Sequence, residues 1–186
     1  MNVNKWGPGG WIFLHTISFN YPLEPNENDK QRYTIFFNSL KNILPCIYCR
    51  QSFEIYTKYI PLENFLESRE GVTYWLFRIH NLINEKLFKE KEKENFKNVV
   101  LKYEKIRAGC SKLLKDGDKE KKFNSCQVKK EIKNDDISIF VNIAESKYKK
   151  IIDDMVKKLY ESDENPNIEY LNYLKKNGKY NINYSS

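Results

Sequence analysis

Apolar side chains recur every three or four residues through successive segments of the first 110 residues. This spacing marks one face of an α-helix, and prolines or polar connections end the segments. The segments comprise residues 9–21, 33–44, 46–60, 72–87 and 96–106. With only 7 Gly and 6 Pro in 186 residues, the chain has too few for a turn-rich β-sandwich. We therefore predict an all-α fold in which short connections join the helices into a bundle.

The amino-acid composition of the chain changes after residue 110. Residues 111–136 are polar and rich in lysine, which predicts a linker or a loosely packed loop. A helical stripe of apolar residues follows at 137–159 and ends near Asn165-Pro166. This last part is too small to have much of a core alone, so it should pack on the bundle, on another copy or on a partner. The predicted organisation is a domain at 1–110, a linker at 111–136 and a C-terminal helical extension at 137–186.

Composition and charge narrow the class of protein. The sequence is 40% hydrophobic and 31% charged, and its longest apolar stretches are too short to cross a bilayer. The N-terminus lacks an apolar run followed by a small-residue cleavage site, so we expect no secretion signal. The net charge is +7, yet lysine and glutamate alternate from residue 89 to 94, as on a solvated helix face. We expect a soluble protein without a membrane span and without nucleic-acid binding.

The four cysteines carry the most specific chemical signal. Cys46 and Cys49 form a C-x-x-C pair at a predicted helix start, where unpaired backbone N–H groups stabilise a thiolate on the first sulfur. Taken alone, the pair indicates either a redox disulfide or half of a zinc site. Cys110 and Cys126 could complete a zinc site, but they are 16 positions apart, whereas structural zinc cysteines usually form two close pairs. A thioredoxin-like fold is not supported, because helix rather than a βαβ unit surrounds the motif.

Polar side chains also lie on stripes that are predicted to face the core. His15 follows Trp11 by one helical turn, and His80 and Asn84 project from the same face of their helix. Such groups are costly in a core unless something satisfies their hydrogen bonds. A flat, polar cofactor between the helices would do so, and so would an internal polar network. The residues alone leave both interpretations open.

An ordered set of motifs runs from residue 6 to about residue 110. The motifs are Trp6-Gly7 with Trp11 and His15, Pro45-Cys46-Ile47-Tyr48-Cys49, His80-Asn81-Leu82-Ile83-Asn84-Glu85-Lys86-Leu87, and Tyr103. Each motif is weak by itself, but the ordered set resembles the Erv/ALR family of FAD-linked sulfhydryl oxidases. The similarity is greatest to the short forms that large cytoplasmic DNA viruses encode.

The resemblance implies a four-helix bundle with an additional short helix, which holds FAD noncovalently and commonly works as a homodimer. It also implies a redox-active Cys46-Cys49 disulfide, with Cys46 as the outer sulfur that a substrate thiolate attacks and Cys49 as the inner sulfur beside the flavin. No metal is implied. The residues that would bind FAD are Gly7, Trp11, His15, His80, Asn81, Asn84, Lys86 and Tyr103.

The implied activity is an FAD-dependent thiol oxidase that forms disulfide bonds in client proteins and reduces O2 to H2O2. Its partners would be reduced client proteins or a thioredoxin-like carrier, and a viral origin would place it in the host cytoplasm or the virion. The alternative from another class is a non-enzymatic, zinc-stabilised helical interaction module built on the cysteines.

Two departures from the family pattern concern cysteines. Many cellular members have a structural disulfide that starts just before the His-Asn motif, where this chain has Phe77. Cellular members also often carry a shuttle cysteine pair near the N-terminus, and this N-terminus has no cysteine. Cys110 and Cys126 are therefore expected to form a disulfide, either a shuttle pair or, as we favour, a structural tie. A third departure is Pro8, which stands where the family often has a basic residue.

Overall fold

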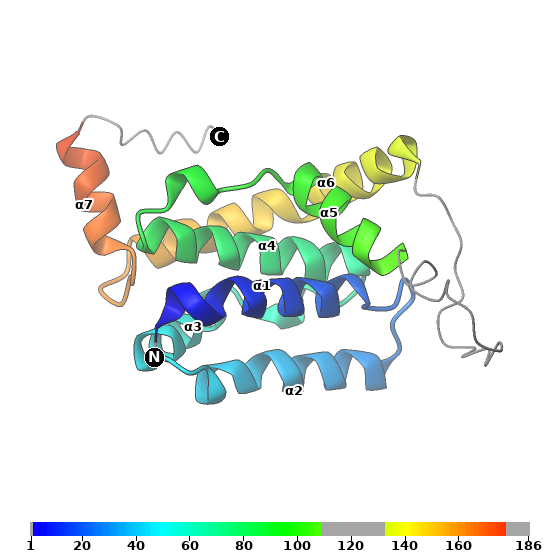
Figure 1. The fold of residues 1–186 in the computed structure, drawn as a ribbon, viewed down its shortest axis with the longest axis horizontal. Coiled ribbons are helices and arrows are strands. Elements are labelled where there is room, and N and C mark those ends of the chain that lie inside the picture. The colour runs from blue at the N-terminus through cyan, green and yellow to red at the C-terminus, as the bar shows by residue number, and fades with distance from the viewer. Residues whose placement is uncertain (1, 109–132, 178–186) are drawn as a thin grey trace, which may run out of the picture.

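The computed structural model describes residues 2–108 and 133–177, and these residues form helices joined by turns and loops (Figure 1). The all-α prediction is confirmed. The helices are α1 Val3–Phe19, α2 Glu27–Ile43, α3 Ile47–Tyr59, α4 Arg69–Lys86, α5 Phe96–Ala108, α6 Asn134–Tyr160 and α7 Ile168–Lys176, with 3-10 turns η1 Leu62–Phe65 and η2 Glu90–Glu92.

Local sequence signals fix where the bundle helices begin. At the start of α2, the Asn26 side chain accepts a hydrogen bond from the Asp29 backbone N–H (3.0 Å), and the Asp29 carboxylate accepts one from the Asn26 backbone N–H (3.1 Å). This reciprocal pair is a capping box, which satisfies backbone donors that the helix cannot. Ser68 caps α4 in the same way by accepting from the Gly71 N–H (3.2 Å).

The first helix is longer than the sequence predicts. We expected it to begin at Gly9, but α1 begins at Val3, and Pro8 lies inside it. The Asn2 side chain caps the new start by accepting a hydrogen bond from the Asn4 N–H (3.0 Å). A proline inside a helix removes one backbone hydrogen bond. Helix α1 accommodates Pro8 together with sixteen other residues. The six added residues bring Gly7 onto the same helix as Trp11 and His15.

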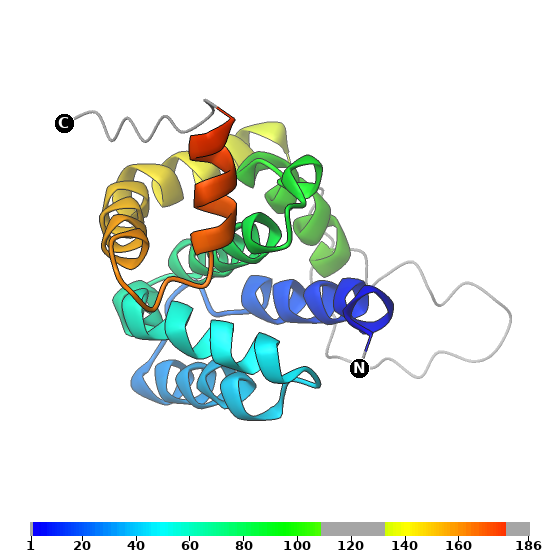
Figure 2. The same ribbon diagram turned by 90° about the vertical axis from the view of Figure 1, so that its left-hand side faces the viewer.

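Helix α4 is the centre of the molecule. Figures 1 and 2 show α1 on one side of α4 and α6 on the other, and α4 packs against both. Trp75 of α4 is fully buried, and its indole N–H donates to the Ile60 carbonyl (2.8 Å). Phe37 and Phe53 contact the Trp75 ring edge-on, with centroid distances of 5.3 and 6.4 Å. Residues of α2, α3 and the loop that follows α3 thus converge on one α4 side chain.

The start of α4 requires a glycine. A Cβ atom added to Gly71 would lie 2.2 Å from the Phe65 carbonyl oxygen and 2.9 Å from the Tyr148 ring. Phe65 belongs to η1, and Tyr148 belongs to α6, so two elements approach the α4 backbone at this point. The hydroxyls of Ser68 and Tyr148 also lie within hydrogen-bond distance (3.2 Å).

The C-terminal extension packs on the bundle, which is one of the three arrangements that the sequence left open. Helix α6 lies along α4, where Arg78 pairs with Asp153 (2.7 Å). It begins at Asn134, three residues before the predicted stripe, and α7 follows in a region for which we predicted no separate helix. The side chains that α6 buries are Ile137, Val141, Ala144, Tyr148, Ile152, Val156 and Leu159.

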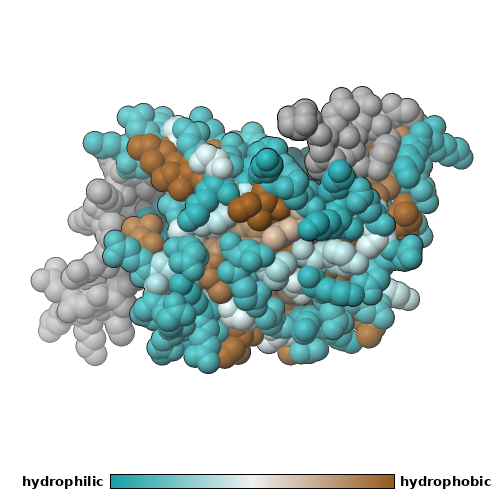
Figure 3. Space-filling view, turned by 180° about the vertical axis from the view of Figure 1, so that it is seen from behind, coloured by the Kyte–Doolittle hydropathy of each residue, from teal (hydrophilic) through white to brown (hydrophobic). Residues whose placement is uncertain are grey.

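The surface opposite to the view of Figure 1 is mostly hydrophilic, with separate hydrophobic patches (Figure 3). No helix in the described ranges is long and apolar enough to span a bilayer.

The turn between α6 and α7 places one buried amide between two bundle helices. Asn167 is 1% exposed, accepts a hydrogen bond from the Tyr56 hydroxyl (2.5 Å) and donates to the Leu82 carbonyl (2.9 Å). Tyr56 belongs to α3, and Leu82 belongs to α4. The extension is therefore connected to both helices by a polar group that has no access to water.

We expect Asn167→Ala to lower the free energy of unfolding by about 2 kcal/mol, because it leaves the buried Tyr56 hydroxyl without its acceptor. Chemical denaturation followed by circular dichroism measures the change. Asn177→Ala is the matched control, since Asn177 is exposed and should change the stability by less than about 0.5 kcal/mol. Equal effects of the two variants would contradict the assignment of Asn167 as a buried tie.

Candidate functional site

The two cysteines of the C-x-x-C motif lie at the start of α3. Cys46 is the N-cap residue with an extended backbone, and its carbonyl accepts from the N–H groups of Cys49 (3.1 Å) and Arg50 (3.0 Å). Both cysteines are free thiols in the structure, and both are partly exposed. The helix start therefore holds the two sulfur atoms one turn apart.

The two thiols have opposite electrostatic surroundings. A hydrogen bond from the Cys49 thiol lowers the pKa of Cys46, and the backbone N–H groups of Cys49 and Tyr48 lower it further. Burial, together with the neighbouring Cys46, raises the pKa of Cys49 to about 12. In the dithiol form Cys46, the more accessible sulfur, is therefore the thiol that ionises at the lower pH.

A cluster of rings lies where α1, α4 and α5 meet. The Trp11 and His80 rings are stacked, with centroids 3.8 Å apart and planes at 15°. His15 stacks on Tyr103 at 4.7 Å, and His15 Nε2 lies 3.2 Å from His80 Nδ1. The structure thus brings together four residues that are separated by up to 92 positions in the sequence.

The two histidines are neutral at pH 7. Burial, helped by the charges of Lys102 and Lys89, lowers the pKa of His80 to about 3. Burial and the neighbouring His80 hold the pKa of His15 well below its usual value. The Nδ1 atom of His15 is buried and has no hydrogen-bond partner among the described residues. A buried nitrogen in this condition is costly, which indicates that a group from outside the chain can bind there.

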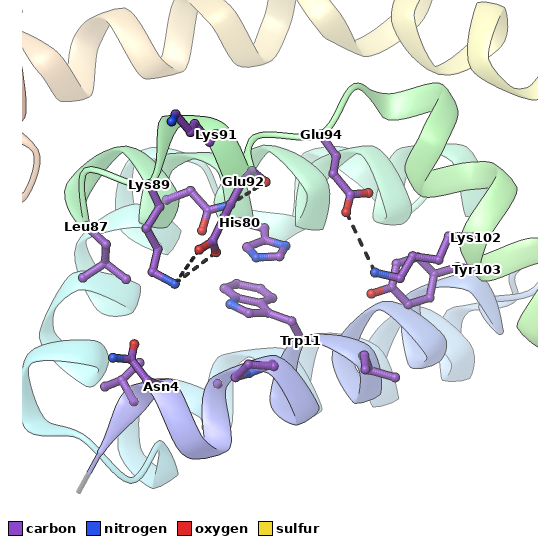
Figure 4. Close-up of a pocket in the computed structure, with 15 residues that line it drawn as sticks. Asn4, Trp11, His80, Leu87, Lys89, Lys91, Glu92, Glu94, Lys102 and Tyr103 are labelled. Carbon is purple, nitrogen blue, oxygen red and sulfur yellow. Dashed lines mark hydrogen bonds and ion pairs between the residues drawn. The ribbon is translucent and has the colours of Figure 1, made fainter.

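A cavity of about 650 Å³ opens beside the ring cluster (Figure 4). Five of the predicted cofactor residues line it, namely Gly7, Trp11, His80, Asn84 and Tyr103. Asn81 and His15 line a small adjoining pocket that shares His80, Asn84 and Tyr103 with the larger cavity. At Gly7 an added Cβ would meet only Val3, at 3.5 Å, so the protein leaves open space beside this residue.

The cavity rim contains charged residues that the sequence analysis interpreted differently. The alternating run at 89–94 was expected to be a solvated helix face, but Lys89, Lys91, Glu92 and Glu94 line the cavity, and only residues 90–92 form a turn of helix. Lys102 of α5 lies on the same rim. Figure 4 shows the pairing of Lys89 with Glu92 (3.0 Å) and of Lys102 with Glu94 (3.9 Å). The alternation of charge in the sequence does not indicate that this segment lines a cavity.

Lys86 is the one predicted cofactor residue that lines neither pocket. Its ammonium group instead donates a hydrogen bond to the Ser52 hydroxyl of α3. The neighbouring α4 residues Asn84 and Leu87 do line the cavity. The end of α4 therefore lies between the cavity and the helix that carries the two cysteines.

No group of three or more His, Cys, Asp or Glu side chains in residues 2–108 and 133–177 is arranged to hold a metal ion. Cys110 and Cys126, which the zinc alternative requires, lie outside the described residues.

The similarity to known proteins lies in the same part of the chain as the site. Residues 8–106 match the model of the Erv1/Alr family. A probable FAD-linked sulfhydryl oxidase of Acanthamoeba polyphaga mimivirus is 41% identical over 85 residues, which are 45% of this chain and 59% of that protein. The mitochondrial FAD-linked sulfhydryl oxidase ERV1 of Saccharomyces cerevisiae is 35% identical over 97 residues, 51% of this chain and 49% of that protein. The chain thus spans about half the length of these relatives.

Among solved structures, the yeast Erv1 core superposes with a TM-score of 0.51 and 29% identity, over 55% of this chain and 84% of that structure. The range that the family model matches, residues 8–106, starts in α1, contains the C-x-x-C pair and ends in α5. It therefore includes residues of each helix that contributes to the ring cluster. Because the family match covers more than half of the 186 residues, including the C-x-x-C pair and the ring cluster, the chain belongs to the Erv1/Alr family.

Proposed function

We propose that the chain is an FAD-linked thiol oxidase, which transfers electrons from client thiols through Cys46 and Cys49 to FAD in the cavity between α1, α4 and α5. One observation carries the proposal: the end of α4 adjoins both a thiol pair with the charge on the outer sulfur and a cavity lined by flat and amide side chains. The relatives are named FAD-linked sulfhydryl oxidases, and a similar solved structure is titled the FAD binding domain of yeast Erv1.

The residues of the cavity fit FAD. A volume of about 650 Å³ lies in the range of cofactor sites. The Trp11 and His80 rings offer a flat surface for stacking. In the small adjoining pocket the Nδ1 of the neutral His15, which has no partner among the described residues, offers a hydrogen bond. The lysines of the rim suit the two phosphates, since the exposed ion pairs that hold them contribute little and can be exchanged for a phosphate contact.

The thiol steps follow from the electrostatics of the pair. In the disulfide form, a client thiolate attacks Cys46 Sγ, so a client–Cys46 bond forms while the Cys46–Cys49 bond breaks and Cys49 leaves as a thiolate. A second client thiolate then attacks the client sulfur, which releases oxidised client and the Cys46 thiolate. A lowered pKa makes Cys46 the better leaving group in this second step. The chemistry that FAD would supply in the cavity is acceptance of two electrons from the dithiol, whose two protons are released as the Cys46–Cys49 disulfide re-forms, and reduction of O2 with two protons to H2O2.

Client proteins, or a thioredoxin-like carrier of their electrons, are the partners that this chemistry requires. Cys46 is accessible to them, and Ile47 and Tyr48 beside it are 52% and 71% exposed. The viral relatives support a viral origin, with action in the host cytoplasm or the virion. For Cys110 and Cys126, which lie outside the described residues, we keep the proposal of a disulfide that ties the extension to the bundle.

The first prediction concerns the order of the two sulfurs. Cys49→Ser should abolish oxidation of a small dithiol while FAD stays bound, because Cys49 lines neither pocket. Cys46→Ser should also abolish turnover, but it leaves a Cys49 thiol without its partner, so a broad long-wavelength charge-transfer band should grow as pH rises. Absorption spectra of the two purified variants measure this, and a band in the Cys49 variant instead would reverse the assignment.

The second prediction concerns the cavity. Trp11→Ala and His80→Ala should each weaken FAD binding about tenfold, which is about 1.4 kcal/mol, because each removes one half of the stacked pair. Flavin fluorescence titration of the apoprotein gives the dissociation constants. Ile143→Ala on α6 is the control, since Ile143 is 43% exposed and lines neither pocket. Unchanged binding in both cavity variants would assign the rings to a packing role alone.

We also propose that the chain forms a homodimer through α1 and α2. Phe13 of α1 and Ile35 of α2 are 59% and 63% exposed, and the Phe13 ring contacts Phe36 of α2 edge-on at 6.3 Å. An exposed aromatic ring that contacts a second helix, together with an exposed aliphatic side chain on that helix, is typical of an interface.

The double variant Phe13→Ser/Ile35→Ser should shift the protein from dimer to monomer, because it removes apolar area that the dimer would bury. Sedimentation equilibrium measures the mass. Ile139→Ser on α6 is the control, since Ile139 is 57% exposed but lies on the extension. A monomeric parent protein would exclude the dimer.

A further inference from the structure

A partly buried hydrogen-bond chain holds Lys86 against the helix of the inner thiol. The Lys86 ammonium donates to the Ser52 hydroxyl, and that hydroxyl donates to the Tyr48 carbonyl (2.8 Å). Ser52 is only 4% exposed, and it follows Cys49 by one turn on α3. The charge of Lys86 acts on Cys49 and favours its thiolate. The position of this lysine at the end of α4 is therefore fixed relative to the cysteine helix.

We propose that Lys86 stabilises the negative charge on the Cys49 sulfur at the moment when a client occupies Cys46. The proposal rests on the thiol chemistry given above and assigns Lys86 to the thiol pair, not to the cofactor. Lys86 acts through its charge, and Ser52 is its positioning residue.

The need for such a charge follows from the burial of Cys49. In the dithiol form Cys46 is the thiol that ionises first, and Cys49 remains protonated because its own pKa is about 12. When a client thiolate attacks Cys46, the electron pair of the broken disulfide bond goes to Cys49 Sγ. Burial disfavours an anion there, and a nearby cation compensates for the lost solvation.

The other charged groups around Cys49 do not replace Lys86. Arg50, the next residue of α3, directs its guanidinium to the Leu44 carbonyl (2.7 Å). Lys86 is a side chain whose charge lowers the pKa of Cys49, and it belongs to the packed helix α4.

The test measures the Cys49 thiol directly and needs neither flavin nor client. In the full-length Cys46→Ser background, the rate of iodoacetamide alkylation at Cys49 is followed against pH by peptide mass spectrometry. Adding Lys86→Gln should slow alkylation at a fixed pH about tenfold, which corresponds to a rise of about one pKa unit. Glutamine still donates a hydrogen bond to Ser52, so the packing is preserved while the charge is lost.

Three further variants separate charge from packing. Lys86→Arg should restore the parent rate, because it retains the charge. Lys58→Gln is the control and should leave the rate unchanged. It removes one positive charge from α3, the helix that carries Cys49, at a position where Lys58 pairs with the exposed Glu164. Ser52→Ala, with Lys86 intact, should slow alkylation about threefold, because the ammonium loses its anchor, and it serves as the second test if the glutamine variant fails to fold.

Parent-like alkylation in either Lys86→Gln or Ser52→Ala would overturn the proposal, and so would failure of Lys86→Arg to restore the rate. Failure of the proposal about Lys86 is distinguishable from failure of the proposed oxidase function. A parent protein that binds no FAD but shows the charge effect on Cys49 would refute the oxidase and leave Lys86 as the partner of this thiol.

Discussion

The enclosure of α4 is the constraint on which the rest of the structure depends. The helix is covered by α1 on one side and by α6 on the other, and Trp75 at its middle joins it to the aromatic side chains of α2 and α3. A helix enclosed in this way cannot expose its polar side chains to bulk water. His80 and Asn84 must therefore find partners inside the molecule or in a bound ligand. The Asn84 amide donates to the Glu92 carbonyl (3.3 Å), whereas the His15 ring that adjoins His80 keeps one nitrogen without a partner.

Two opposite electrostatic environments meet at the end of α4. On the cavity side the histidines are neutral, because burial and neighbouring lysines disfavour their protonation, so they act as hydrogen-bonding groups and stacking surfaces. On the α3 side the Cys49 thiol and the backbone N–H groups of the helix start lower the pKa of Cys46 and so favour a negative charge on this sulfur. The neutral ring cluster and the thiol pair lie on different sides of the end of α4. In the proposed function, spacing along one helix would separate binding of the cofactor from chemistry at sulfur.

The helical pattern predicted most of the fold because apolar periodicity reports directly on burial. The pattern led to wrong expectations where something other than apolar periodicity determines the structure. The start of α1 depends on Asn2 as a cap, which lies ahead of the apolar stripe, and the charged run at 89–94 lines the cavity because of how α4 and α5 pack, not because of its own spacing. The C-x-x-C pair and the His-Asn motif identified the candidate site, since their residue types carry chemistry. The place of Lys86 beside Ser52 could not be predicted, because it depends on the register of α4 against α3.

The extension adds a constraint to the site without contributing to the cavity beside the ring cluster. The family match ends at residue 106, whereas α6 and the turn at Asn167 come later in the chain. Asn167 joins Tyr56 of α3 to the Leu82 carbonyl of α4, which are the helices that carry Cys49 and Lys86. Lys93, just after η2, also pairs with Glu85 (2.9 Å) and lies near the Tyr170 hydroxyl of α7 (3.3 Å). Because an electrostatic interaction depends on distance, a segment that fixes α3 against α4 also fixes the charge that Cys49 experiences.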